Sequence, residues 1–278
     1  MRGAGRRRFE KENGALILKR TLNAVGLVLA VYILTAYFVL PAIWKHYEHH
    51  PAMENSPKVT RTKEGIPADP LNVGLIASQP ELILAMSKAG WLPADPITAK
   101  SSVGILESVV TGRAYPDAPV SHLYLWGRIQ DLAFEKPAGS NARERHHVRF
   151  WKSHELGLNQ RPLWIGAATF DRSVGMSHRT GQLTHHISPD IDAERDLLIH
   201  DLNEAGQLAL FFQVTGVGLI FRGRNGGGDP YFTNGELSIG VLMQNHLAND
   251  KLAEKLPDPP AVELKNQIWT KLRQVFAG

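Results

Sequence analysis

The chain opens with a basic tail that is followed at once by a long apolar run. Residues 21–44 contain no charged side chain, and residues 1–20 carry seven Lys and Arg. At about 1.5 Å per residue, a helix of this length crosses a hydrocarbon core of about 30 Å. Basic residues stay on the cytoplasmic side of such a helix, and on its far side only Lys45 lies close. The sequence therefore predicts one transmembrane helix at 21–44, a cytoplasmic tail at 1–20, and the bulk of the chain outside the cytoplasm.

A cleaved signal peptide is the alternative to this anchor. The apolar run is longer than the apolar core of a typical signal peptide. Its end, from Phe38 to Pro41, lacks the small residues that cleavage needs. An uncleaved signal anchor is the favoured interpretation.

The positive net charge of the chain comes from the tail. Residues 1–20 contribute seven positive and two negative charges, so the formal +4 of the whole chain becomes about −1 for the remainder. Nucleic-acid binding needs a basic patch on the folded domain, and no nucleic acid is expected as a partner. The chain has no cysteine, which excludes disulfides, thiolate zinc sites and thiol catalysis.

About 230 residues follow the anchor, which is enough for one large domain. Residues 45–68 mix prolines, charges and three histidines with few apolar residues, so we expect a linker there. These histidines (His46, His49 and His50) fit an interfacial collar better than a metal site. A folded domain is predicted at 69–245, and a polar linker with a C-terminal amphipathic helix at 246–278.

Apolar periodicity predicts the elements of the domain. Residues 71–77 form a short buried-strand pattern, and Ser78 with Glu81 forms a capping box for a helix that Gly90 ends. Strands are predicted at 129–136, 145–152, 163–171 and 208–214, with helices at 98–110 and from Ser188, as the cap, to Ala205. Residues 163–170 are almost continuously apolar, which favours a central strand.

Short connections between the middle strands favour antiparallel neighbours. Residues 217–222 and 237–243 flank a Gly-rich segment and predict a long hairpin. The expected fold is α+β, a mostly antiparallel sheet covered by helices and preceded by the transmembrane helix. In the C-terminal helix at 261–276, the residues expected to face inward are Val262, Ile268, Trp269, Leu272 and Phe276.

The predicted strand at 145–152 has one apolar and one cationic face. Because side chains alternate, Arg145, His147 and Arg149 share a face, and His146 lies on the other. Two arginines and a histidine on one face can bind a phosphate or a carboxylate. The alternative is a solvated sheet face whose arginines pair with acids on neighbouring strands.

The densest polar cluster of the chain runs from residue 184 to 196, from a strand end onto a helix start. His185, His186 and Asp190 in this cluster, with Asp171 and His146 nearby in the predicted sheet, are candidate catalytic residues or ligands of a divalent metal. No metal ligand set follows from the spacing, because adjacent residues of a strand point in opposite directions. The alternative is that the acids only complement the helix dipole and the histidines are ordinary strand residues.

Residues 223–230 form a Gly-rich segment whose backbone N–H groups suit an anion nest. A hairpin turn that needs positive φ explains the glycines as well. The segment matches neither the Walker spacing nor a dinucleotide fingerprint.

Several ordered strings of this sequence resemble the LssY C-terminal domain family over about residues 69–215. They lie at 94–96, 115–121, 124–137, 145–147, 164–171 and 184–196. The resemblance implies a domain attached to a bacterial membrane protein, so the expected location is the bacterial inner membrane, with the domain periplasmic or extracellular. It brings no activity and no residue role with it.

Three functions are compatible with these patterns. The first is binding of an anionic lipid or envelope ligand through Arg145, His147 and Arg149. The second is a metal-assisted hydrolase that acts on a phosphorylated lipid or an envelope glycan. The third is a scaffold of the cell envelope, in which the C-terminal helix and its Trp269 dock another envelope protein.

Overall fold

The computed structural model describes residues 3–40, 42, 56–94, 100, 122–138, 144–179, 181, 183–214, 221–244 and 248–277. The chain divides into two compact units, Met1–Tyr47 and Glu48–Gly278. The predicted helix at 98–110 falls almost entirely outside the described residues, and the three histidines of the predicted collar are outside them as well.

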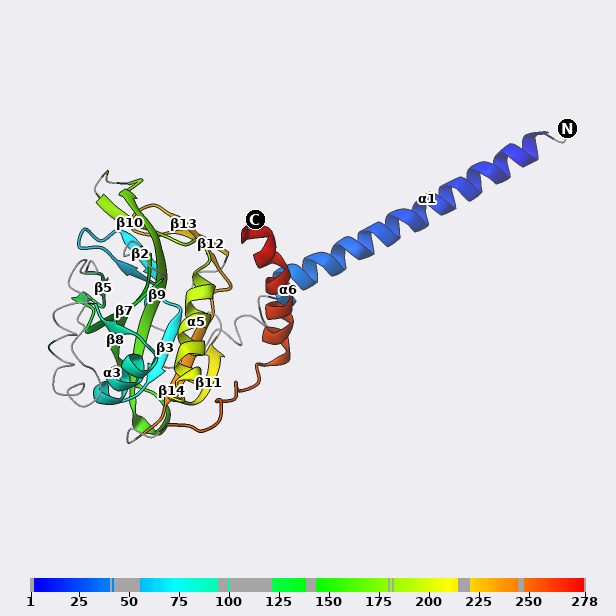
Figure 1. Cartoon of the computed structure of the whole chain (residues 1–278). Coiled ribbons are helices and arrows are strands. Elements are labelled where there is room, and N and C mark those ends of the chain that lie inside the picture. The colour runs from blue at the N-terminus through cyan, green and yellow to red at the C-terminus, as the bar shows by residue number, and fades with distance from the viewer. Residues whose placement is uncertain are drawn as a thin grey trace. The chain divides into compact units, whose positions relative to one another are not determined.

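The described residues of the first unit form a long helix. Helix α1 (Gly3–Leu34) continues into the π-helical segment η1 (Thr35–Val39). Within it, the 23 residues Ile17–Val39 have a mean hydropathy of 2.1 and are long and apolar enough to cross a membrane. The predicted apolar N-terminal helix is therefore present (Figure 1).

The second unit is built on an eight-stranded sheet (Figure 1). Seven strands follow one another in the order β11-β14-β3-β9-β8-β7-β4, and β10 pairs with β9. Only the β14–β3 pair among these is parallel. In chain order the strands are β3 (Val73–Ile76), β4 (Leu92–Pro93), β7 (Leu132–Pro137), β8 (Arg145–Leu156), β9 (Pro162–Met176), β10 (Leu183–Ile187), β11 (Leu208–Val214) and β14 (Leu237–Leu242).

Two helices, α3 (Gln79–Lys88) and α5 (Ile191–Glu204), cover one face of this sheet. Helix α3 begins at the predicted capping box, in which Ser78 Oγ accepts from Glu81 N and Glu81 Oε2 accepts from Ser78 N. Apolar side chains of both helices pack on the sheet, and each fully buried Leu or Phe contributes about 1.5–3 kcal/mol. The α+β fold with a mostly antiparallel sheet and helices is thus confirmed.

A smaller four-stranded sheet packs against the opposite face, with a second apolar cluster beneath it. Its order is β2-β1-β5-β6, formed by β1 (Val59–Arg61), β2 (Pro67–Pro70), β5 (Tyr124–Leu125) and β6 (Arg128–Ile129). Strand β1 and part of β2 lie inside the segment 45–68 that the sequence predicts as a linker. Local composition does not reveal these short strands because their pairing partners supply the apolar contacts.

The predicted long hairpin is wrong. Strand β12 (Phe221–Arg224) pairs with β13 (Pro230–Thr233) in a separate two-stranded sheet. Strand β14 instead lies between β11 and β3 in the large sheet. All six of its residues are buried, and a strand buried on both faces requires a position inside a sheet.

The start of α5 also differs from the prediction. Asp190, and not Ser188, is the N-cap, and its Oδ1 accepts from Ala193 N at 3.2 Å. Pro189 O accepts from Phe232 N, and Asp190 bridges Phe232. This extended pairing keeps the backbone out of the helix until Ile191.

Helix α6 (Pro260–Ala277) is confirmed as the last element, but its inward face is narrower than predicted. Val262 and Trp269 are buried, whereas Ile268 and Leu272 are 52% and 38% exposed. Trp269 Nε1 donates to Asp192 Oδ2 at 3.0 Å. Trp269 is therefore used inside its own unit, and it is not the exposed docking residue that the scaffold hypothesis needs.

Candidate functional site

The cationic face of β8 forms part of a pocket. Arg145, His147 and Arg149 alternate along β8 and line a pocket of about 440 Å³. Their exposed fractions are only 6%, 3% and 4%, respectively, so the interpretation of this strand face as solvated is wrong. A pocket of this volume suits a small ligand or a lipid head group.

The other walls of the pocket come from segments far apart in the sequence. Strand β10 contributes Thr184 and His185, and the Gly-rich turn after β12 contributes Asn225, Gly226 and Gly227. The segment around β1 and β2 adds a further wall, with Thr62, Lys63, Glu64, Ile66, Ala68 and Asp69. Three patterns that the sequence presents as separate candidate sites therefore meet at one pocket.

Acidic side chains balance the two arginines. Arg145 Nη1 lies 2.9 Å from Glu135 Oε2, and Arg145 Nε lies 3.2 Å from Asp171 Oδ2. Arg149 Nη1 lies 3.1 Å from Asp69 Oδ2. Burial raises the pKa of Glu135, and the opposing effect of Arg145 is smaller. The predicted pairing with acids on neighbouring strands is thus present, and the pocket offers acceptors beside its donors.

Asp171 on β9 contacts two histidines of the pocket. Its Oδ1 lies 3.3 Å from His147 Nδ1, and its Oδ2 lies 3.3 Å from His185 Nδ1. Neither pair is aligned as a hydrogen bond, and Asp171 Oδ1 and both Nδ1 atoms lack a hydrogen-bond partner among the described residues. Buried polar atoms without partners mark a place where a water or a ligand can bind.

The charge of Asp171 is set by these neighbours. Burial raises the pKa of its carboxyl, but His147, His185 and Arg145 together outweigh burial and hold the pKa well below its usual range. Asp171 is therefore a carboxylate at neutral pH. Its negative charge is available to orient an imidazole or to balance a bound cation.

The two pocket histidines differ in access. His147 is buried, and its Nε2 lies 2.7 Å from Thr169 Oγ1. The side chain of His185 is 34% exposed. Burial lowers the pKa of His185, and Arg145 and His147 add to this effect while Asp171 opposes it. His185 is thus the imidazole that a ligand in the pocket can reach.

The remaining catalytic candidates do not line the pocket. His146 lies on the helix side of the sheet, where its Nδ1 is 2.8 Å from Glu194 Oε2. His186 Nδ1 bonds Asp229 Oδ1 at 2.7 Å, and Asp190 caps α5 and pairs with Arg273 at 2.7 Å. Alternation along the strands separates His146 from His147 and His185 from His186. His185 and Asp171 are therefore the candidates that the fold brings together.

Sequence reasoning missed several polar residues of the site. Thr169 lies two positions before Asp171 on the same strand, so alternation alone could have found it. Asp69 and Glu135 pair with arginines of β8 from two other strands. No local pattern marks these two acids, because their partners are set by the order of strands.

A family model described as LssY C-terminus matches residues 53–237, about two thirds of the chain. Every residue that lines the pocket lies inside this range. Searches of curated proteins and of solved structures give no match.

Proposed function

Because the chain belongs to the LssY C-terminus family, we propose that it is a membrane-anchored envelope protein whose family domain binds an anionic ligand in the pocket. The observation that carries this proposal is the convergence of the cationic face of β8 with the Gly-rich turn and β10 on one pocket. Such a pocket can recognise the phosphate of a lipid head group or of an envelope glycan.

The mixed charge of the pocket favours a ligand that carries both an anionic group and hydroxyls. Lys63, Arg145 and Arg149 are cationic donors, and Glu64 and Asp69 are acceptors. The ion pairs to Asp69, Asp171 and Glu135 hold the guanidinium groups at the pocket wall before a ligand arrives. Such preorganisation reduces the entropic cost of binding.

The apolar N-terminal helix supplies the membrane part of the proposal. It is long enough to span a bilayer, and its basic tail favours a cytoplasmic N-terminus. We place the chain in the bacterial inner membrane as a single-pass signal anchor, with the family domain periplasmic or extracellular. Tethering raises the effective concentration of head groups around the pocket.

The test is a binding titration of the full chain in phosphatidylcholine nanodiscs, with glycerol 3-phosphate as the probe and glycerol as the uncharged reference. Asp69→Asn combined with Arg149→Gln removes one ion pair as a unit, so neither charge is left buried alone. We expect glycerol 3-phosphate to bind about tenfold more weakly to this variant, because charge-assisted hydrogen bonds contribute about 1.5–3 kcal/mol. Lys251→Gln, at an exposed lysine that does not line the pocket, is the control. Equal affinities for glycerol 3-phosphate and glycerol would exclude the proposal.

A specific observation also favours a second function, hydrolysis of a phosphorylated lipid or glycan. His185 reaches the pocket, and its Nδ1 lies 3.3 Å from the Asp171 carboxylate, which is close enough to orient the imidazole as a general base once the two groups align. In this case His185→Ala should abolish release of phosphate from a phosphorylated lipid while binding of glycerol 3-phosphate persists. A wild-type chain that releases no phosphate from phosphatidic acid or lipid-linked sugar phosphates leaves binding as the function.

A further inference from the structure

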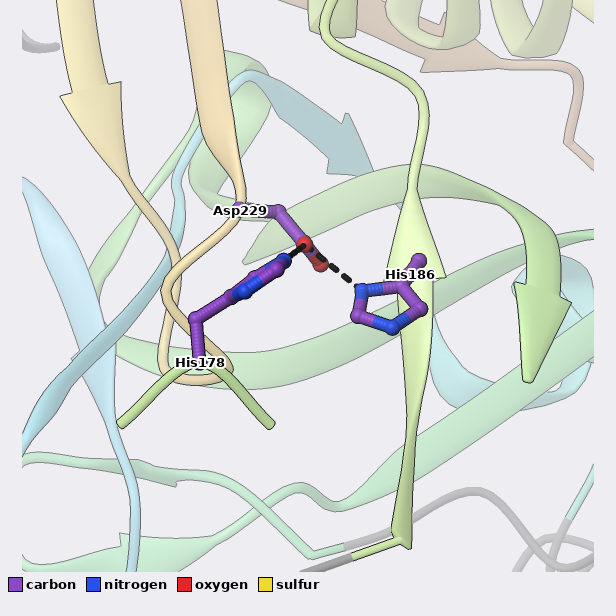
Figure 2. Close-up of side chains that lie close together, drawn as sticks. All are labelled: His178, His186 and Asp229. Atoms are coloured by element: carbon purple, nitrogen blue, oxygen red, sulfur yellow. Dashed lines mark hydrogen bonds and ion pairs between the residues drawn. The ribbon is translucent and has the colours of Figure 1, made fainter. Parts of the chain in front are cut away.

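Two histidines and a buried carboxylate gather beside the pocket, outside the set of residues that line it. His178 follows β9, His186 lies on β10, and Asp229 ends the Gly-rich turn (Figure 2). One ligand atom of each lies within 4.8 Å of the others. We propose that these three residues form a binding site for a divalent transition-metal ion such as Zn²⁺.

Hydrogen bonds orient the carboxylate of Asp229 toward the two histidines. Asp229 is 1% exposed, and its Oδ2 accepts from Ile187 N at 3.2 Å and from Asn225 Nδ2 at 3.4 Å. Its Oδ1 then faces both imidazoles, 2.7 Å from His186 Nδ1 and 3.5 Å from His178 Nε2 (Figure 2). Hydrogen bonds that orient a metal-binding carboxylate in this way are typical of metal sites.

The charge of Asp229 points to a cation. In the part of the chain that the structure describes, its ion-pair partners are the two histidines and no Lys or Arg. A buried carboxylate is costly unless a positive charge or hydrogen bonds compensate it. A divalent ion supplies that charge and leaves the histidines neutral, as metal ligation requires.

Glycines make the space for both rings. A Cβ on Gly175 would lie 2.5 Å from His186 Nε2, so only glycine lets this ring lie over β9. Gly228 has φ +92, and a Cβ there would lie 2.9 Å from the Cβ of His178. The segment of His178 is fixed to the turn as well, because His178 N donates to Gly227 O at 2.8 Å.

The donor set fits zinc. Zn²⁺ takes imidazole nitrogen and carboxylate oxygen at about 2.0–2.1 Å in tetrahedral geometry, which separates neighbouring ligand atoms by about 3.4 Å. The His178–Asp229 separation already has this size, whereas the His186–Asp229 pair is at hydrogen-bond distance and opens when the ion replaces the proton between them. The side chain of His178 is 62% exposed, so water can reach the cluster from the side of this imidazole. Three protein ligands with an open position are typical of catalytic zinc.

The test measures Zn²⁺ bound to the full chain, purified without a histidine tag, by competition with a chromophoric chelator. We expect one tightly bound Zn²⁺ per chain and a rise in the unfolding temperature when Zn²⁺ is added. His178→Ala and Asp229→Asn each remove a ligand atom, so each should weaken the affinity by about a hundredfold or more, since loss of an outer-shell partner alone costs up to about a hundredfold. His178 is largely exposed, so its substitution leaves folding intact even where Asp229→Asn does not.

Two controls separate this site from other histidines. His200→Ala removes an exposed histidine of α5 and should leave the affinity unchanged. His46, His49 and His50 can bind zinc by themselves, so zinc binding that persists unchanged in His178→Ala would overturn the inference, as would a wild-type chain without stoichiometric zinc. The inference does not rest on the proposed ligand of the pocket, because the ion pair tested there, Asp69 with Arg149, contributes no ligand to the ion.

Discussion

Asp171 is the residue through which the charges of the pocket are coupled. It contacts Arg145, His147 and His185 from one buried position on β9. Removal of its charge leaves a buried arginine with one carboxylate fewer, and loss of a partner in a buried ion pair costs about 3–5 kcal/mol. The consequences of one substitution should therefore extend over the whole cationic face.

We predict that Asp171→Asn lowers the free energy of unfolding by about 3 kcal/mol at neutral pH. The pKa of Asp171 is depressed in the folded state, so its carboxylate contributes stability above the unfolded pKa of about 3.9 and loses it as the pH falls through the folded pKa. The gap between wild type and variant should thus narrow below about pH 4. Urea unfolding of the detergent-solubilised chain between about pH 3 and pH 7 measures this difference in the free energy of unfolding.

The wild type must be compared with Asp171→Asn because Glu135 changes the free energy of unfolding with pH in the opposite direction. Burial raises the pKa of Glu135, so its titration lowers stability as the pH rises. The free energy of unfolding is measured against pH for the wild type and for Asp171→Asn, and the difference between the two curves isolates the contribution of Asp171. Asp250→Asn, at an exposed aspartate, is the matched control and should show no pH-dependent gap. A gap for Asp171→Asn that is as large at pH 3 as at pH 7 would contradict the assigned pKa direction.

Individual residues of the sites were predictable from the sequence only where one strand carries them. Period-two alternation correctly groups Arg145, His147 and Arg149 and separates them from His146. The cluster of His178, His186 and Asp229 has no such signature, since its members come from three segments. Short-range patterns contain no information about which turns meet in space.

Among the elements, α3 depends on its capping box. We predict that Ser78→Ala lowers stability by about 1 kcal/mol, because Glu81 N loses the side-chain oxygen that accepts from it. Ser78→Asp keeps a capping oxygen and should lose much less. Thermal unfolding followed by circular dichroism compares the two variants. Equal losses would mean that the hydrogen bond contributes little to α3.

Helix α6 offers a matched pair of neighbouring apolar residues. We predict that Trp269→Phe costs about 1–2 kcal/mol, since it removes the donor to the buried Asp192. Ile268→Ala, one position away and half exposed, should change stability by less than about 0.5 kcal/mol. Urea unfolding measures the loss of stability in both variants. The reverse order would mean that Ile268 is covered in solution.

The elements show where sequence patterns are sufficient. Strands β7, β8, β9 and β11 and helix α5 follow from apolar periodicity, and helix α3 follows from its periodicity and its capping box, because those signals are local. The hairpin predicted from 217–222 and 237–243 is wrong because β14 pairs with β11 and β3, and pairing partners remote in sequence leave no local pattern. Likewise, Trp269 of α6 is buried against Phe232 and Asp192, and these contacts are not defined by the periodicity of the helix.

At the scale of the whole molecule, the charge asymmetry around the apolar helix predicts the topology. We expect protease added outside intact spheroplasts to digest the family domain and to leave a short membrane-bound fragment that contains residues 17–39. Immunoblotting with an antibody to the N-terminus detects the fragment. A cytoplasmic marker protein must stay intact in the same sample, and a full-length chain that survives would show that the domain lies inside.

The parallel pairing of β3 with β14 determines when the large sheet can be completed during synthesis of the chain. Gly74 leaves the ribosome early but pairs with Ile239, which is synthesised near the end. Strand β3 thus has one edge unpaired for most of translation, and closing so long a loop is slow. A chain released before residue 237 lacks β14, the strand that joins β11 to the rest of the sheet. Its open edge would invite pairing with other chains, so premature termination should yield aggregates and not a smaller working domain.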